Sequence, residues 1–180
     1  MALREIVKEG DDVLTKKCRE VTKFDDRLAQ LIDDMIDTLN ESGGVGLAAP
    51  QVGFLRRVVV VRVDPEQEAY ELVNPEIIKA EGKQVVLEGC LSLPGKWGIT
   101  SRPYRVTVRA QNRSGEFYEV TGDKLLAQAF CHEIDHLNGI LYNTVCERML
   151  MPEEIELYNE GELDLGDQCY VELPEGVEEE

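Results

Sequence analysis

Residues 123–139 read DKLLAQAFCHEIDHLNG, and this stretch decides how the rest of the chain must be arranged. Its apolar residues recur at the spacing of an amphipathic helix over 123–138, and Gly139 suits the position just beyond the last turn. His132 and His136 lie one helical turn apart, so both imidazoles point to the same side. We therefore expect a central helix that presents two histidines to one point.

These are the only two histidines in the chain, and Glu133 lies beside the first of them. Histidines at i and i+4 of a helix can bind one metal ion, and the adjacent glutamate can reach water there without being a ligand. The alternative is a pair of helix-face histidines satisfied by hydrogen bonds. Because His132, Glu133 and His136 occur together in one motif, the sequence favours a metallohydrolase in which Glu133 is the acid/base.

A third ligand must be Cys, Asp or Glu, because a catalytic zinc-type site needs three protein ligands and one open position. Cys90 is the favoured candidate: it ends a strand pattern in EGCLS (88–92), where Gly89 lets the backbone approach a ligand closely. A lone cysteine is otherwise usually a small buried hydrophobe. The acidic alternatives follow a glycine and a proline and lie in no helical pattern: Glu153, Glu154 and Glu156.

The segment GVGLAAPQ (44–51) leaves its backbone accessible because its side chains are small. One interpretation is a helix cap followed by a tight turn. The functional interpretation is a strip around Val45 and Gly46 that pairs main chain to main chain with an extended peptide. Gln51 would then donate its amide to a developing oxyanion.

An α+β fold follows from the order of the elements. An amphipathic helix is predicted over 25–40, stopped by Gly43-Gly44. Strand patterns then follow at 58–63, 69–73, 76–81 and 84–88, with a hairpin over 104–120 that turns at 112–115. This order predicts mostly antiparallel sheets packed around the HEIDH helix.

The net charge of −17 is concentrated at the C-terminal end, where residues 151–180 hold twelve acids and no Lys or Arg. We predict a catalytic domain over 1–150 and an acidic extension over 151–180 that is solvated and partly disordered, or else a docking element. Such a charge disfavours nucleic-acid binding, which needs clustered Lys and Arg.

The chain is expected in the cytoplasm. No apolar run approaches the ~20 residues of a membrane span, and the N-terminus lacks the long apolar stretch of a secretory signal. The five cysteines are scattered and odd in number, so we expect reduced thiols.

The three motifs GVGLAAPQ (44–51), EGCLS (88–92) and HEIDH (132–136), in this order, closely resemble the bacterial peptide deformylases, over about residues 4–148. The resemblance implies Cys90, His132 and His136 as ligands of one Fe²⁺ ion, with Zn²⁺, Co²⁺ or Ni²⁺ as substitutes. It implies Glu133 as acid/base, and Gln51 with the backbone N–H of Leu91 as the oxyanion hole. The implied reaction is attack of metal-bound water, assisted by Glu133, on the formyl group of N-terminal formyl-Met, releasing formate.

The implied partners are nascent formylated peptides near the ribosome, with no direct nucleic-acid or membrane binding. The Met side chain needs an apolar pocket, and ordinary core packing is the alternative role for the residues that we assign to it. Leu125 and Ala129 are chosen because they share the His132 face of the helix. The full predicted peptide site comprises Val45, Gly46, Val86, Gly89, Leu125 and Ala129.

The expected roles of four further residues depend on the resemblance or on their position in the sequence. Glu88 and Arg102 resemble a family pair that braces the cysteine loop. Trp97 is expected either to cap the mouth of the site or simply to pack. Cys131 replaces the usual Gln before HExxH and lies about 100° off the His132 face, so we do not expect it to be a ligand.

Two other functions remain open at this point. A HExxH endopeptidase would not use Cys90 as its third ligand. A structural metal or peptide-binding module would need a fourth protein ligand, for which Cys131 is the candidate.

Overall fold

The computed structural model describes residues 2–179, and it confirms the α+β class with antiparallel sheets. The helices are α1 (Asp26–Ser42), α2 (Lys124–Leu137) and α3 (Pro152–Glu160). The strands are β1 (Gly46–Ala48), β2 (Val58–Val61), β3 (Tyr70–Glu81), β4 (Lys83–Cys90), β5 (Leu93–Arg102), β6 (Arg105–Gln111), β7 (Phe117–Asp123), β8 (Arg148–Met149) and β9 (Tyr170–Glu172). Short 3₁₀ turns lie at Asp12–Thr15, Ala49–Val52, Tyr142–Thr144 and Gly166–Gln168.

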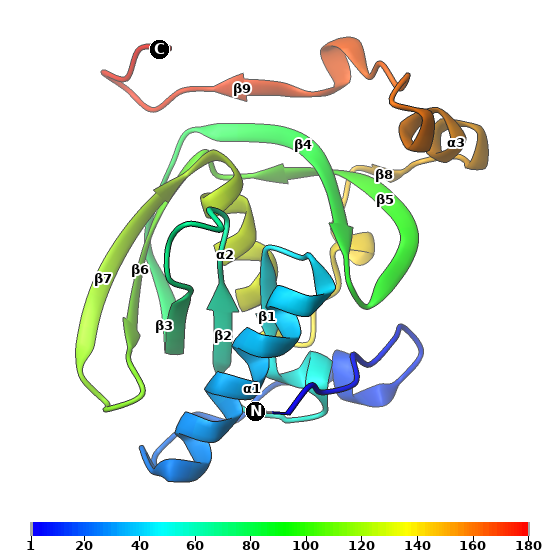
Figure 1. The fold of residues 1–180 in the computed structure, drawn as a ribbon. Coiled ribbons are helices and arrows are strands. Elements are labelled where there is room, and N and C mark those ends of the chain that lie inside the picture. Colours follow the sequence, from blue (N-terminus) through cyan, green and yellow to red (C-terminus); the bar gives the residue numbers. More distant parts are fainter. Residues whose placement is uncertain (1, 180) are drawn as a thin grey trace.

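The strands form two sheets, one ordered β1-β2-β3-β6-β7 and the other β8-β5-β4-β9. All neighbouring strands in both sheets are antiparallel. Figure 1 shows α2 in the middle of the molecule with strands of both sheets around it. Among the described residues, no helix is long and apolar enough to cross a membrane.

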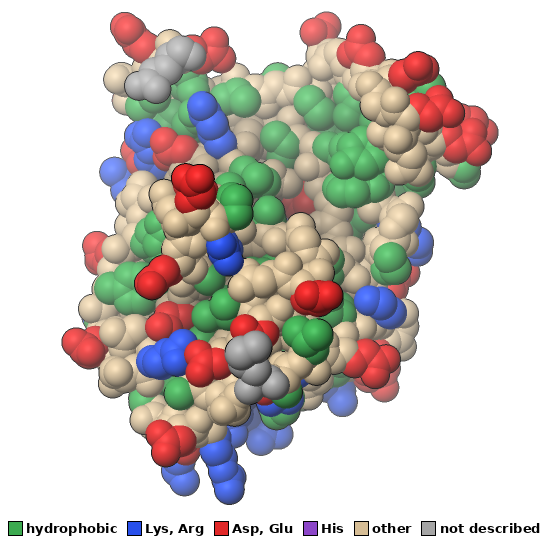
Figure 2. Space-filling view, in the orientation of Figure 1, with side chains coloured by type: hydrophobic (Ala, Val, Ile, Leu, Met, Phe, Trp, Pro, Cys, Tyr) green, Lys and Arg blue, Asp and Glu red, His purple; other side chains and the backbone are tan. Residues whose placement is uncertain are grey.

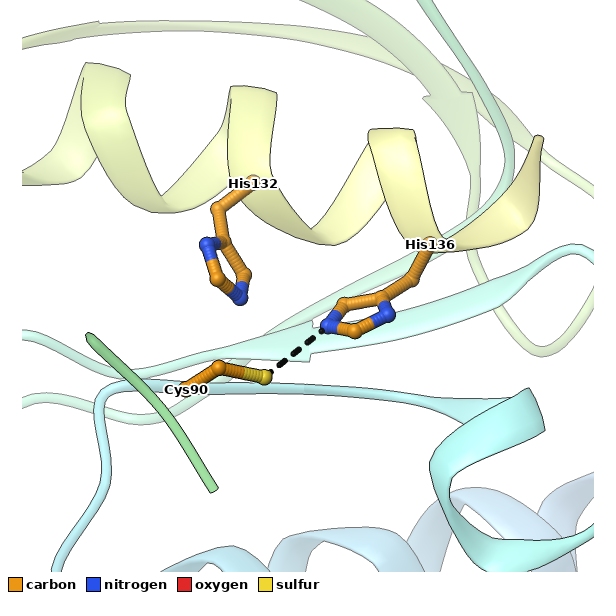
Figure 3. A group of neighbouring side chains, drawn as sticks. All are labelled: Cys90, His132 and His136. Carbon is orange, nitrogen blue, oxygen red and sulfur yellow. Dashed lines mark hydrogen bonds between the residues drawn. The ribbon is translucent and has the colours of Figure 1, made fainter. Parts of the chain in front are cut away.

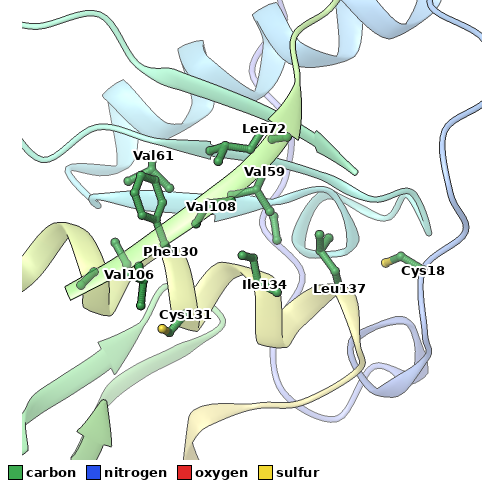
Figure 4. Packing of buried hydrophobic residues seen from close by; sticks show 14 residues of the cluster. Cys18, Val59, Val61, Leu72, Val106, Val108, Phe130, Cys131, Ile134 and Leu137 are labelled. Carbon is green, nitrogen blue, oxygen red and sulfur yellow. The ribbon is translucent and has the colours of Figure 1, made fainter. Parts of the chain in front are cut away.

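Strand β2 explains why α2 is central. Its four valines alternate, so that Val58 and Val60 pack with α1 while Val59 and Val61 pack with α2. The larger sheet is therefore covered by a helix on each face at this point. Figure 4 shows the α2 side of this packing, in which Phe130, Ile134 and Leu137 lie among side chains of the sheet. The face of α2 that carries the histidines is left for the site.

Helix α1 extends two residues beyond the predicted 25–40. Its N-terminus is capped by Asp25, whose side chain accepts a hydrogen bond from the Leu28 N–H. It ends at Gly43, which has a φ of +71°, a conformation that glycine adopts without strain. The chain then leads directly into β1, at the edge of the larger sheet.

Two strand predictions differ from the structure. The separate strands predicted at 69–73 and 76–81 are one strand, β3, whose pairing is irregular near Asn74 (φ +51°). The side chain of Asn74 bonds the backbone N–H and carbonyl of Val21, which stabilises this unusual conformation. Strand β5 was not predicted, because Pro94 and Gly95 at its start are typical of a loop.

The acidic segment after residue 150, expected as a partly disordered extension, carries α3 and β9. Strand β9 pairs antiparallel with β4, with Val85 opposite Tyr170. Ile155, Leu163 and Leu165 pack beside Val85. The apolar residues that interleave with the acids thus cover the edge of β4, and burying them offsets the cost of ordering the segment.

Candidate active site

Helix α2 places both histidines inside the protein, with relative exposures of 7% for His132 and 1% for His136. Their ring centroids lie 4.9 Å apart. The helix ends at Leu137, and Gly139 follows with a φ of +72°. A Cβ at Gly139 would lie 2.6 Å from the Thr15 carbonyl oxygen, so a glycine is needed where this helix meets the N-terminal segment.

Cys90, at the end of β4, lies opposite the two histidines. Its Sγ is 3.4 Å from Nε2 of His136 (Figure 3). The ligand atoms of Cys90, His132 and His136 all lie within 4.8 Å of one another, and no other group of three such residues is found within residues 2–179. One thiolate and two imidazoles suit Fe²⁺, Zn²⁺ and similar ions. The residues therefore fit a metal ion with three protein ligands.

The other candidate ligands do not join this group. Glu153, Glu154 and Glu156 lie on α3, outside the ligand cluster. Cys131 is buried in the cluster that includes residues of α2 and the larger sheet, and it is not part of the ligand group. Burial raises the pKa of its thiol to about 11, so it remains protonated at neutral pH. The structure thus offers three ligands and not the four of a closed structural zinc site.

Glu133 is buried beside the histidines, with Oε1 at 4.0 Å from Nε2 of His132. Burial raises the pKa of its carboxyl group to about 7. Its Oε2 atom is buried and has no hydrogen-bond partner within residues 2–179. A buried carboxylate oxygen without a partner is costly, which indicates that a polar group belongs next to it.

Gly46 in β1 sets the position of Glu133. A Cβ at Gly46 would lie 2.7 Å from Oε1 and 2.8 Å from Cγ of Glu133. The glycine backbone is therefore in direct contact with this carboxylate, and a side chain there would push the carboxylate aside.

Gly46→Ala should lower kcat/KM for the chain's substrate by about 10²-fold, since a displacement of ~1 Å in a catalytic group can have that effect. Metal content, measured by atomic absorption, should stay at the wild-type level because Cys90, His132 and His136, the group that could hold an ion, are unchanged. An alanine variant with unchanged kcat/KM would contradict the conclusion that Gly46 fixes Glu133.

A network of donors surrounds Glu88, the residue two before Cys90. Its carboxylate accepts from Arg102 (3.0 and 2.5 Å), Thr100 (3.1 Å) and Gln128 (3.2 Å) and lies 2.9 Å from Nδ1 of His132. Burial alone would raise its pKa, but the hydrogen bonds from His132 and Arg102 outweigh burial and lower it to about 2. An ionised Glu88 fixes the orientation of His132 and leaves Nε2 free for a metal.

The pairing of Glu88 with Arg102 was expected from the sequence, whereas the bonds from Thr100 and Gln128 were not. Gln128 also donates to the Leu87 carbonyl at 3.1 Å, so it joins α2 to β4. The sequence could have indicated Gln128, because it lies one helical turn before His132 on the same face of the helix.

Gln51 is buried next to the cysteine. Its Oε1 accepts from the Ala48 N–H at 2.9 Å, and its Nε2 donates to Ser92 Oγ at 3.1 Å. The same Nε2 lies 3.6 Å from Cys90 Sγ. These contacts hold the amide beside Cys90. The contribution of Ser92 was not foreseen, although it is the last residue of EGCLS.

A cavity of about 660 Å³ opens onto these residues. It includes five of the six residues predicted for the peptide site, namely Val45, Gly46, Gly89, Leu125 and Ala129. Val86 is not among the lining residues, and Leu87 is. The lining begins at Leu87 and continues through Leu91, so Val86 lies just before the part of β4 that reaches the cavity. Gln51, Leu91 and Trp97 also line the cavity.

One wall of the cavity is an unpaired strand edge. β1 is the outermost strand of its sheet and pairs only with β2, with Gly46 opposite Val61. The residues just before and within β1, from Ser42 to Gly46, line the cavity. An edge of this kind has free backbone N–H and C=O groups that an extended chain can pair with.

The sequence and the structure both match known proteins. The model of the family described as polypeptide deformylase matches residues 3–149. The chain belongs to this family. A peptide deformylase of Caldicellulosiruptor bescii is 53% identical over 156 residues, which cover 87% of this chain and 93% of that protein.

Solved structures of the deformylase family have the same fold. The peptide deformylase of Legionella pneumophila has a TM-score of 0.78 and 41% identity, covering 91% of this chain and 94% of that one. One from Acinetobacter baumannii, solved with Met-Ala-Ser bound, has a TM-score of 0.76 and 35% identity, covering 80% and 99%. As a family member, this chain is an enzyme that removes the N-terminal formyl group from newly made polypeptides, in a metal-dependent hydrolysis.

Proposed function

We propose that deformylation takes place in the cavity at the Cys90, His132 and His136 cluster, with Fe²⁺ as the ion in the cell. The observation that carries this proposal is the convergence of the three ligand atoms within 4.8 Å, beside the buried carboxylate of Glu133. Zn²⁺, Co²⁺ or Ni²⁺ would suit the same ligands, because one sulfur and two imidazole nitrogens accept each of them.

The peptide substrate would lie along the free edge of β1. Its backbone would pair with residues 44–46, an interaction that does not depend on side-chain identity. Gly89 would line the opposite side of the peptide path. The Met side chain would enter the apolar part of the cavity at Leu125 and Ala129, with Leu87 in the place that we predicted for Val86.

The bound ion supplies Lewis-acid polarisation of the formyl carbonyl and lowers the pKa of water in the site. Glu133 accepts the proton of the attacking water at its carboxylate and then donates it to the leaving amine. A carboxyl with a pKa of about 7 suits both steps near neutral pH. The Gln51 side-chain amide and the Leu91 backbone N–H donate to the oxyanion that develops on the formyl oxygen.

The substrates would be nascent formylated chains, met near the ribosome in the cytoplasm. The catalytic domain would comprise residues 1–150, which is supported by the end of the family match at residue 149. Direct binding of nucleic acid is not expected, because the net charge is −17.

The direct test is release of formate from a formyl-Met tripeptide by protein purified under argon and loaded with Fe²⁺. We expect turnover of the formylated peptide and none of the same peptide without the formyl group. Cleavage of unblocked peptides without formate release would instead make the chain an endopeptidase. Full metal loading without any turnover would favour a structural or peptide-binding module.

A further inference from the structure

Trp97 forms part of the cavity wall and is held between two other segments. It lies on β5 and lines the cavity together with Gly89. A Cβ at Gly89 would lie 2.6 Å from the Trp97 ring, so the indole lies directly on the backbone next to Cys90. The indole also contacts Tyr158 of α3, with the ring centroids 4.6 Å apart and the ring planes tilted by 46°. The position of this wall therefore depends on the C-terminal segment.

The segment that carries Tyr158 is attached firmly to the same strand. The Leu150 N–H donates to the Trp97 carbonyl at 2.8 Å, immediately before α3 begins. Arg148 makes two bonds of 2.8 Å to the Glu154 carboxylate, which also accepts from the Met151 N–H at 2.7 Å. These contacts fix the start of α3 relative to β5, so that Tyr158 reaches the indole at a defined place.

Apolar packing adds to this attachment. Trp97 belongs to a cluster with Ile155, Leu163 and Leu165 of the C-terminal segment. Figure 2 shows apolar side chains gathered where α3 meets β4 and β5, with the acidic residues of α3 on the outer side. Except for Glu154, which pairs with Arg148, the acids of α3 face solvent, while the apolar residues stabilise the cavity wall.

We propose that Tyr158 is a positioning residue for peptide binding: through Trp97 it sets the wall against which the residues after formyl-Met lie. This inference rests on the assignment of the cavity to the peptide substrate. Tyr158 itself lies outside the cavity lining, so it acts only through the indole. It gives the acidic C-terminal segment, which lies beyond the family match, a part in substrate recognition.

The test compares Tyr158→Ala, Tyr158→Phe and Leu157→Ala in the full-length, metal-loaded enzyme. Leu157 is the matched control, a half-exposed neighbour on α3 that does not stack on Trp97. KM for formyl-Met-Ala-Ser should rise about three- to tenfold in Tyr158→Ala, in line with the loss of one aromatic pair. The kcat and metal content should remain near wild type, because no ligand or acid/base group is changed. Tyr158→Phe, which keeps the ring, should restore the wild-type KM.

A second readout uses the fact that Trp97 is the only tryptophan. Its fluorescence should shift to longer wavelength in Tyr158→Ala, and titration with Met-Ala-Ser should show weaker binding by the same factor as KM. An unchanged KM and an unchanged titration in Tyr158→Ala would overturn the proposal. Equal losses for formyl-Met-Ala-Ser and for formyl-Met alone would also overturn it, since the wall would then not contact the later residues. A wild-type enzyme that releases no formate would refute the assignment of the cavity instead.

Discussion

Glu133→Gln should lower kcat by about 10²–10⁴-fold, the usual contribution of a general acid/base. Glutamine has nearly the same shape, so it fits beside Gly46, but it can neither accept the proton of water nor return one to the amine. Metal content should equal that of wild type, because Glu133 is not among the three ligands. The measurement is formate release under saturating formyl-Met tripeptide, together with metal analysis of the same sample.

The matched control is Glu119→Gln, which changes an exposed glutamate on β7 that is not among the residues lining the cavity. It should retain wild-type kcat. If Glu133→Gln also retained full activity, the proton would have to move through another group, and the role proposed for Glu133 would be wrong.

Cys90→Ala should weaken metal binding by more than about 10²-fold and abolish deformylation. Loss of a residue that merely orients a metal ligand typically costs 10–100-fold, and loss of a ligand should cost more. The variant would be dialysed against a metal buffer and its metal content compared with wild type. Activity should not return when Fe²⁺ is added at the concentration that saturates the wild-type enzyme.

Cys131→Ala is the informative comparison for Cys90→Ala, because it removes the neighbouring thiol on α2 that faces the core. Metal content should be unaffected in this variant. Equal metal loss in both variants would indicate a four-ligand structural site. If Cys90→Ala retained its full metal content, the third ligand would be a residue other than Cys90, as expected for a HExxH endopeptidase.

The metal-ligand cluster could be predicted from sequence because its parts are local or chemically restricted. His132 and His136 share a helix face by spacing alone, and a chain with two histidines needs a ligand of another type. Cys90 was identified by its motif. The central position of α2 follows from the alternating valines of β2, which require packing on both faces.

Long-range pairing could not be predicted in the same way. The strand character of β5 depends on its partner β4, and its first residues, including Pro94 and Gly95, favour a loop when read alone. The structure of residues 151–179 depends on the pairing of β9 with the edge of β4, and the local sequence does not reveal this pairing. The same holds for Val86, because the position along β4 at which the cavity begins depends on how the strand packs against the rest of the protein.

The free edge of β1 has a consequence for when the enzyme can act on a protein. A chain end already built into a folded domain has its backbone groups bonded internally, so it has none to offer to residues 44–46. In the proposed binding mode, an N-terminus must be extended and unpaired to complete this sheet and reach the cluster at Cys90. In this binding mode the fold favours substrates that have not yet folded, in addition to requiring a formyl group.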